Sequence, residues 1–110
     1  MYFSVTSATA KKITAAAHSV RTPSLTVKYL AGKPLQYSVV VAKKQGNAVQ
    51  RNRVKRVIRE IVKRKKTLFP AGYYLLYFRR QCDRLRRDSV ENDLDEIILK
   101  LSEKHNEKNP

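Results

Sequence analysis

The segment from residue 48 to residue 66 carries two opposed surfaces, and it constrains the fold more than any other part of the chain. Its apolar side chains recur at alternating spacings of three and one, which is an amphipathic helical stripe: Val54, Val57, Ile58, Ile61 and Val62. At about 100° per residue, Asn52, Arg56, Arg59 and Lys63 fall on the opposite side. The pattern predicts a helix that is docked on a protein core and turns a cationic face outward.

The rest of the chain predicts a small sheet packed with helices. Alternating or apolar runs indicate strands at 25–29, 37–41 and 73–78, and we expect helices at 7–17 and from residue 88 or 89 onward. The first two strands are expected to pair antiparallel, and the β-branched run at 37–41 is expected to lie centrally. These elements predict an α/β (α+β) fold, with helices covering a small sheet.

Length and charge indicate one domain and a polyanionic partner. The chain has 110 residues, which predicts a single domain over 1–110, and its net charge is +15. Residues 1–87 hold 21 basic and two acidic side chains, whereas residues 88–110 hold three basic and seven acidic ones. Such an imbalance is unfavourable for a compact chain unless an anionic partner screens it. Anionic lipids share this sign of charge, but a stripe made for a core argues against membrane binding.

Other classes of protein are disfavoured by what the sequence contains. Its apolar runs are shorter than the ~18 residues of a membrane span, and its first residues do not resemble a signal peptide. The single cysteine, Cys82, cannot form an internal disulfide. We therefore expect a cytoplasmic protein.

The basic segment has the chemistry of a nucleic-acid contact. Nine basic residues and one acid, Glu60, lie between Arg51 and Lys66, without the counter-charges that a merely soluble helix would carry. Guanidinium groups match phosphate oxygens in a bidentate way. Gly46 would permit a positive φ and a close approach of the ligand, and the helix start would offer free N–H groups.

Catalysis by the chain itself is not expected. Metal-dependent hydrolysis needs clustered carboxylates, and residues 1–87 offer only Glu60 and Asp83. The acidic residues at 88–96 are expected to be a solvated helix start, His18 and His105 surface residues, and Cys82 an unreactive thiol. The aromatic run at 73–78 is expected to be core in preference to a stacking platform.

The stretch KKQGNAVQRNRVKRVIRE at residues 43–60 resembles the signature of the bacterial ribonuclease P protein subunit, which has an Arg-Asn-Arg core. The resemblance implies the order αβββαβα, with a four-stranded sheet and a left-handed βαβ crossover. That order has one strand more than the residue patterns predict. Where the family has two phenylalanines on its first helix, this chain has Ile13 and Ala17.

The resemblance also implies a function. It implies one protein per RNA in a ribonuclease P holoenzyme, which is an endoribonuclease that removes the 5′ leader of precursor tRNA. The catalytic groups are expected on the ribonuclease P RNA, with Mg²⁺ bound mainly by that RNA, and the protein contributes affinity for both RNAs. The implied RNA contacts are Lys44, Asn47, Arg51, Asn52, Arg53, Lys55, Arg56, Arg59 and Lys63, and the implied leader-cleft residues are Tyr29, Tyr37, Val40 and Lys43. The alternative is a generic basic RNA-binding protein, such as a ribosomal or assembly protein.

Overall fold

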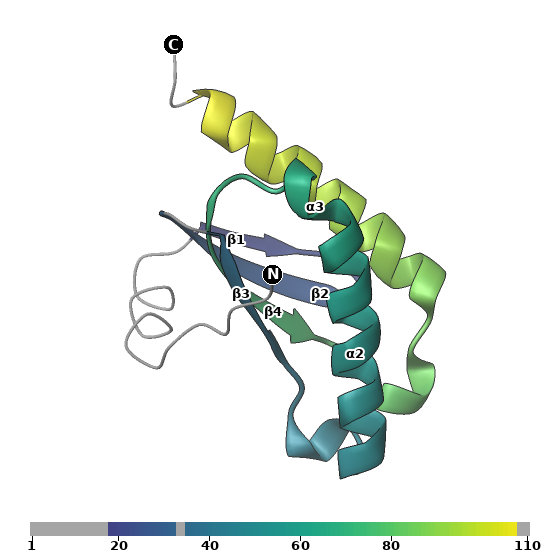
Figure 1. Cartoon of the computed structure of the whole chain (residues 1–110). Coiled ribbons are helices and arrows are strands. Elements are labelled where there is room, and N and C mark those ends of the chain that lie inside the picture. Colours follow the sequence, from purple (N-terminus) through teal and green to yellow (C-terminus); the bar gives the residue numbers. More distant parts are fainter. Residues whose placement is uncertain (1–17, 33–34, 108–110) are drawn as a thin grey trace.

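A computed structural model describes residues 18–32 and 35–107, and the predicted helix at 7–17 lies outside these residues. The described elements run βββαβα along the chain, with short 3-10 turns between them (Figure 1). Their bounds are β1 (His18–Arg21), β2 (Leu25–Ala31), β3 (Gln36–Val40), η1 (Lys43–Gln45), α2 (Ala48–Lys65), η2 (Lys66–Leu68), β4 (Gly72–Phe78), η3 (Cys82–Arg84) and α3 (Arg87–Glu107).

The four strands form one mixed sheet in the order β1-β2-β4-β3. β4 pairs antiparallel with β2 and parallel with β3, so the connection through α2 crosses from β3 to β4. The expected antiparallel pairing of the strands near 25–29 and 37–41 is therefore wrong, and so is the central position of the latter. β4, the most apolar strand, lies between them, with a neighbouring strand paired along each of its edges.

Both helices pack on one face of this sheet (Figure 1). The five stripe residues of α2 are between 0% and 8% exposed, which confirms the amphipathic prediction. They meet alternate residues of the strands and the apolar side of α3, which presents Val90, Leu94, Ile97 and Leu101. Buried side chains in all of these elements form one core cluster.

The strand that the residue patterns missed is β1, which pairs antiparallel with β2. Its four residues are too short to show an alternating pattern, and only Val20 is buried. The β1–β2 turn is held by Thr22, whose hydroxyl donates to the carbonyl of Leu25 and accepts from its N–H. Ser24 follows and donates its N–H to Asp93 of α3 at 2.9 Å, and its hydroxyl donates to the same carboxylate. This contact fastens the hairpin to the helix layer.

Candidate nucleic-acid interface

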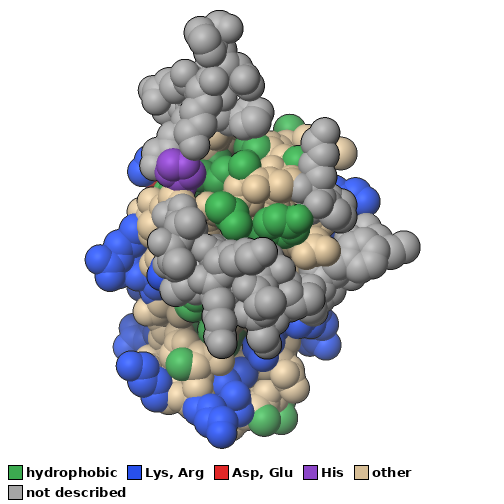
Figure 2. Space-filling model, turned by 90° about the vertical axis from the view of Figure 1, so that its left-hand side faces the viewer, with side chains coloured by type: hydrophobic (Ala, Val, Ile, Leu, Met, Phe, Trp, Pro, Cys, Tyr) green, Lys and Arg blue, Asp and Glu red, His purple; other side chains and the backbone are tan. Residues whose placement is uncertain are grey.

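The polar side of α2 is exposed along its length. Asn52, Arg53, Arg56, Arg59 and Lys63 are exposed, whereas Arg51 and Lys55 at the margins of the stripe are half-buried. Lys43 and Lys44, in the η1 turn just before the helix, are also exposed. Seen from the side, Lys and Arg side chains gather around the lower end of the molecule, where η1 and the first turns of α2 lie (Figures 1 and 2).

The start of α2 is capped reciprocally, and this orients the basic side chains that follow. The Asn47 side chain accepts the N–H of Gln50 at 2.8 Å, and the Gln50 side chain accepts the N–H of Asn47 at 3.0 Å. Asn47 is one of the residues predicted to contact RNA, and its side-chain oxygen is already bound to the helix backbone.

Gly46 is needed here for packing. Its φ of 169° is extended backbone, so the left-handed conformation that glycine permits is not used here. A Cβ at this position would lie 2.9 Å from both Cβ and Sγ of Cys82, closer than real side chains approach. The absence of a side chain lets the start of α2 lie directly against η3.

Gln45 links the η1 turn to the end of β4. Its Nε2 donates to the carbonyls of Phe78 and Arg80, each at 2.7 Å, and its Oε1 accepts the N–H of Ala42 at 2.6 Å. One side chain therefore holds together two segments that are far apart in the sequence. The residues before α2 and the arginine-rich residues after β4 are fixed relative to each other.

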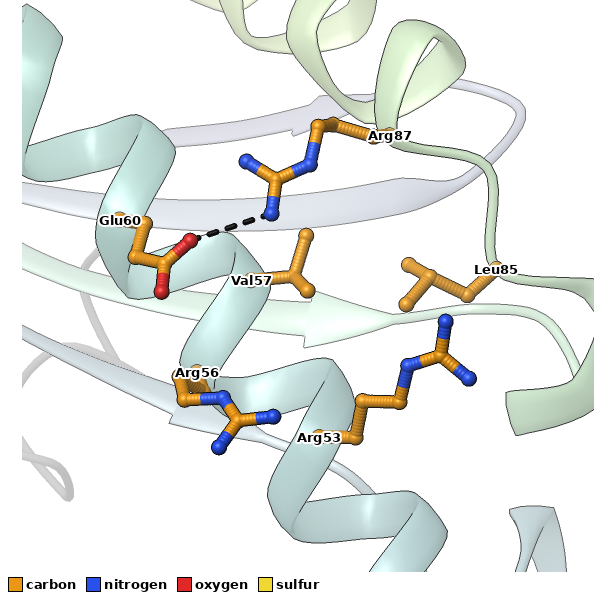
Figure 3. A pocket seen from close by; sticks show the side chains of 6 residues that line it. All are labelled: Arg53, Arg56, Val57, Glu60, Leu85 and Arg87. Carbon is orange, nitrogen blue, oxygen red and sulfur yellow. Dashed lines mark hydrogen bonds and ion pairs between the residues drawn. The ribbon is translucent and has the colours of Figure 1, made fainter.

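A groove of about 400 Å³ opens between α2 and the segment leading into α3 (Figure 3). Arg53, Arg56, Val57 and Glu60 line it from α2, and Leu85 and Arg87 line it from the other side. Glu60 and Arg87 form an ion pair of 3.1 Å across the groove. Arg53 and Arg56 make no ion pair with the described residues. The groove thus has three guanidinium groups and a single carboxylate.

The acidic residues of α3 bind α2 and are not simply a solvated helix start. Glu91 and Asp95 pair with Lys65 of α2 at 3.6 and 2.7 Å, and Glu91 lies 3.9 Å from Arg64. The hydrogen bond that Lys65 donates to Asp95 is the main reason that the pKa of Lys65 is raised above its ordinary value, with the charges of both carboxylates adding to it. Acidic pairing is therefore concentrated at the C-terminal half of α2, which leaves the N-terminal half strongly cationic.

Arg51, the first residue of the Arg-Asn-Arg core, lies beside the buried thiol of Cys82. Burial raises the pKa of Cys82, and the nearby Arg51 charge only partly offsets this. The thiol is thus protonated at neutral pH, as expected for an unreactive cysteine. The Nε of Arg51 is itself buried and has no hydrogen-bond partner among the described residues.

The two tyrosines predicted for the leader cleft lie on the helix-facing side of the sheet. Tyr29 and Tyr37 are 5% and 6% exposed, and both belong to the core cluster. Tyr29 packs at 4.9 Å between ring centroids on Tyr74 and donates its hydroxyl to the carbonyl of Ala71. In the described structure these rings are core side chains and do not offer a face for stacking.

The opposite face of the sheet holds aromatic rings that the residue patterns assigned to the core. Tyr73 and Tyr77 alternate with the buried residues of β4 and are half-buried. Lys28 Nζ lies 6.0 Å from the centroid of the Tyr77 ring, a cation–π distance, and Val40, which is 37% exposed, pairs with Tyr77 in the register. Side chains alternate between the two faces of a strand, so this alternation could have separated Tyr73 and Tyr77 from the core residues of β4. It could be used only once the helices were known to cover one face of the sheet.

None of the helices in the described ranges is sufficiently long and apolar to cross a bilayer. Among the residues that the structure describes, three or more His, Cys, Asp or Glu side chains are nowhere grouped for metal binding.

Comparison with known proteins gives one consistent family. Residues 6–102 match the family described as Ribonuclease P. The ribonuclease P protein component of Petrotoga mobilis is 43% identical over 70 residues, which is 61% of this chain. The match spans 58% of the length of that relative.

Solved structures agree with this match. The ribonuclease P protein of Staphylococcus aureus superposes with a TM-score of 0.76 at 29% identity, covering 89% of this chain and 92% of that one. The ribonuclease P protein from Thermotoga maritima gives a TM-score of 0.71 at 25% identity, covering 80% of this chain and 86% of that one. The α+β fold with its four-stranded mixed sheet is thus the fold of these proteins.

Proposed function

This chain belongs to the ribonuclease P protein family, and from that premise we propose that it is the protein subunit of a ribonuclease P holoenzyme. In this proposal the chain binds the ribonuclease P RNA and the 5′ leader of precursor tRNA, with one protein per RNA. The RNA subunit carries out the cleavage, and the protein raises affinity and screens the repulsion between two polyanions.

The observation that supports this proposal most is the division of α2 into two surfaces. One side is 0% to 8% exposed in the core, so the helix cannot rotate or leave the domain without losing that burial. The other side therefore presents its cations in a fixed arrangement. Arg53 and Arg56 border one groove, with Lys44 close to the helix start. A rigid row of this kind matches the regular phosphates of a folded RNA.

For the leader, we propose the face of the sheet opposite the helices. Tyr77 and Tyr73 would stack on unpaired bases there, and Lys28 would neutralise a phosphate. Val40 lies on this face and keeps its predicted role, whereas Tyr29 and Tyr37 would support it from the core. Lys43 follows β3 by three residues, in the η1 turn that precedes α2.

Mg²⁺ enters this proposal through the RNA subunit. A divalent cation is repelled by the cationic surface built by α2, so its coordination by RNA phosphates is favoured over coordination by these side chains. When bound to the RNA, Mg²⁺ would supply the nucleophile and stabilise the developing charge.

Reconstitution tests the proposed function. The purified protein is added to ribonuclease P RNA at low Mg²⁺ concentration, and cleavage of a precursor tRNA is followed over time. We expect stimulation by the native chain and a marked decrease of it in the double variant Arg53→Ala/Arg56→Ala. The slope of log K against log salt for RNA binding should fall by roughly one for each phosphate that the variant no longer neutralises.

Leader recognition is tested separately with Tyr77→Ala and substrates that differ only in leader length. The variant should lose affinity for the long-leader substrate and bind a leaderless one normally. Binding of many RNAs with no stimulation of cleavage would instead support the generic RNA-binding protein. Cleavage by the protein without RNA would contradict the assignment of catalysis to the RNA.

A further inference from the structure

Residues 79–87, which run from the end of β4 to the first residue of α3, form a second arginine cluster outside α2. This segment, here called the arginine loop, holds five arginines and one acidic residue, Asp83. We propose that its free arginines form a second phosphate-binding site, which contacts the backbone of the same RNA that α2 binds. This inference rests on the proposed function, because that function supplies the RNA.

Two of the five arginines already have structural partners. The Arg79 guanidinium donates to the carbonyl of Thr22, and its backbone N–H donates to the carbonyl of Ser24 at 2.9 Å, so it closes the end of the sheet. Arg87 pairs with Glu60 across the groove beside α2. Arg79 and Arg87 therefore have structural roles that require no ligand.

The other three, Arg80, Arg84 and Arg86, are exposed and make no ion pair with the described residues. All three line the same two adjoining cavities. Two of the carboxylates close to this region are already engaged, since Asp93 accepts from Ser24 and Glu60 binds Arg87. Asp83, which lines the larger cavity, is a single carboxylate against these three guanidinium groups and makes no ion pair with the described residues. Three guanidinium groups gathered around one space repel each other unless an anion occupies it.

The shape of the cavities favours a single anionic group. The smaller one measures about 140 Å³ and is also lined by the hydroxyl-bearing Ser24 and Ser89 and by Phe78. That volume is well below the roughly 300 Å³ at which pockets for drug-sized ligands begin, so it suits one phosphate. The larger one, about 380 Å³, opens beside it and includes Asp83 and Leu85. The Ser24 hydroxyl already donates to Asp93, so the guanidinium forks and the Ser89 hydroxyl are the groups that match the donor pattern that phosphate oxygens need.

The position of the arginine loop favours RNA over a separate acidic protein. Leu85 lines both the larger cavity and the groove that contains Arg53 and Arg56, so the two cationic sites are neighbours. Gln45 holds the carbonyl of Arg80 at 2.7 Å and thereby fixes the loop relative to the start of α2. A polymer with evenly spaced charges can occupy both sites at once, and each site then adds to the affinity of the other.

The test is the salt dependence of binding to ribonuclease P RNA. The loop variant Arg80→Gln/Arg84→Gln/Arg86→Gln is compared with a control, Arg64→Gln/Lys66→Gln/Lys100→Gln, which removes the same charge from the far end of the two helices. For the loop variant, the slope of log K against log salt should fall by about 2–3 more than for the control, at about 0.9 per phosphate that is no longer neutralised. Inorganic phosphate should also compete with the RNA more effectively for the native loop than for the variant.

Equal slopes for the loop variant and the control would overturn the inference. This is also the result expected if the arginine loop binds an acidic protein in place of RNA. If that result accompanies a reduced slope in Arg53→Ala/Arg56→Ala, the proposed function stands and only the loop site fails. If no variant changes the slope and the native chain does not stimulate cleavage, the proposed function itself fails. Thermal melting followed by circular dichroism checks that each variant folds. If the triple loop variant does not fold, the single variant Arg84→Gln replaces it, and the expected decrease in slope is then about 1.

Discussion

Replacing Gln45 by alanine should destabilise the whole domain, although the residue lies in a three-residue turn. The native side chain makes three hydrogen bonds of 2.6 to 2.7 Å, to Ala42, Phe78 and Arg80. Each bond contributes about 0.5–1.5 kcal/mol net, and the two exposed ones fall at the low end because water can replace them. We therefore expect Gln45→Ala to lower the free energy of unfolding by about 1–3 kcal/mol.

The measurement is thermal unfolding followed by circular dichroism. For a domain of this size, each kcal/mol corresponds to about 4–8 °C in Tm. The control is Asn92→Ala, which removes an exposed amide from α3 and should leave Tm nearly unchanged. Equal Tm values for the two variants would refute the reasoning, because Gln45 would then not be holding β4 to the η1 turn.

A second variant separates the donor from the size of the side chain. Gln45→Glu keeps the shape but places a carboxylate against the carbonyls of Phe78 and Arg80, so the pKa of the new carboxyl should be raised in the folded state. A carboxyl whose pKa is raised on folding stabilises the folded state at pH values below its pKa in the unfolded chain, which is about 4.3 for Glu. That stabilisation is lost as the pH rises. The Tm of Gln45→Glu relative to that of the native chain should thus rise as the pH is lowered, whereas the relative Tm of Gln45→Ala should not.

Three further predictions concern the core. Ile58→Ala should lower the free energy of unfolding, measured by urea denaturation, by about 2–5 kcal/mol. Val49→Ala, at a site that is 78% exposed, should change it by less than about 0.5 kcal/mol. Equal decreases for the two variants would contradict the docking of α2 on the core. Burial raises the pKa of Tyr74 far above its ordinary value, so stability should fall as the pH passes about 10, where the unfolded chain releases this proton first. Tyr74→Phe loses the hydrogen bond to Pro70 but should show a shallower alkaline decline, and an identical decline would exclude Tyr74 as its cause. Burial of the Cys82 thiol should make alkylation, measured by mass spectrometry, slow in the native protein and fast in denaturant; similar rates would show that η3 opens readily.

Elements with a strong local pattern could be predicted from the sequence. The stripe of α2 repeats a periodicity that is typical of a helix, and the short apolar run of β4, rich in aromatic residues and preceded by turn residues, favours a strand; both predictions are confirmed. β1 was missed because four residues with one buried side chain carry too little of that pattern. The wrong pairing of β2 with β3 has a different origin, since neighbouring strands usually pair and only the crossover through α2 places β4 between them.

Of the candidate site, the sequence by itself determined that α2 has a cationic face and that residues 1–87 are strongly basic, because charge and helical period are local properties. Only the tertiary structure decided which tyrosines face the helices and which face outward, since that depends on how the strands are layered. It also brought Arg53 and Arg56 opposite Arg87, and it placed the arginine loop beside them. These residues are far apart in the sequence, and their relative positions are set by packing of the core and by single links such as Gln45, which no local pattern encodes.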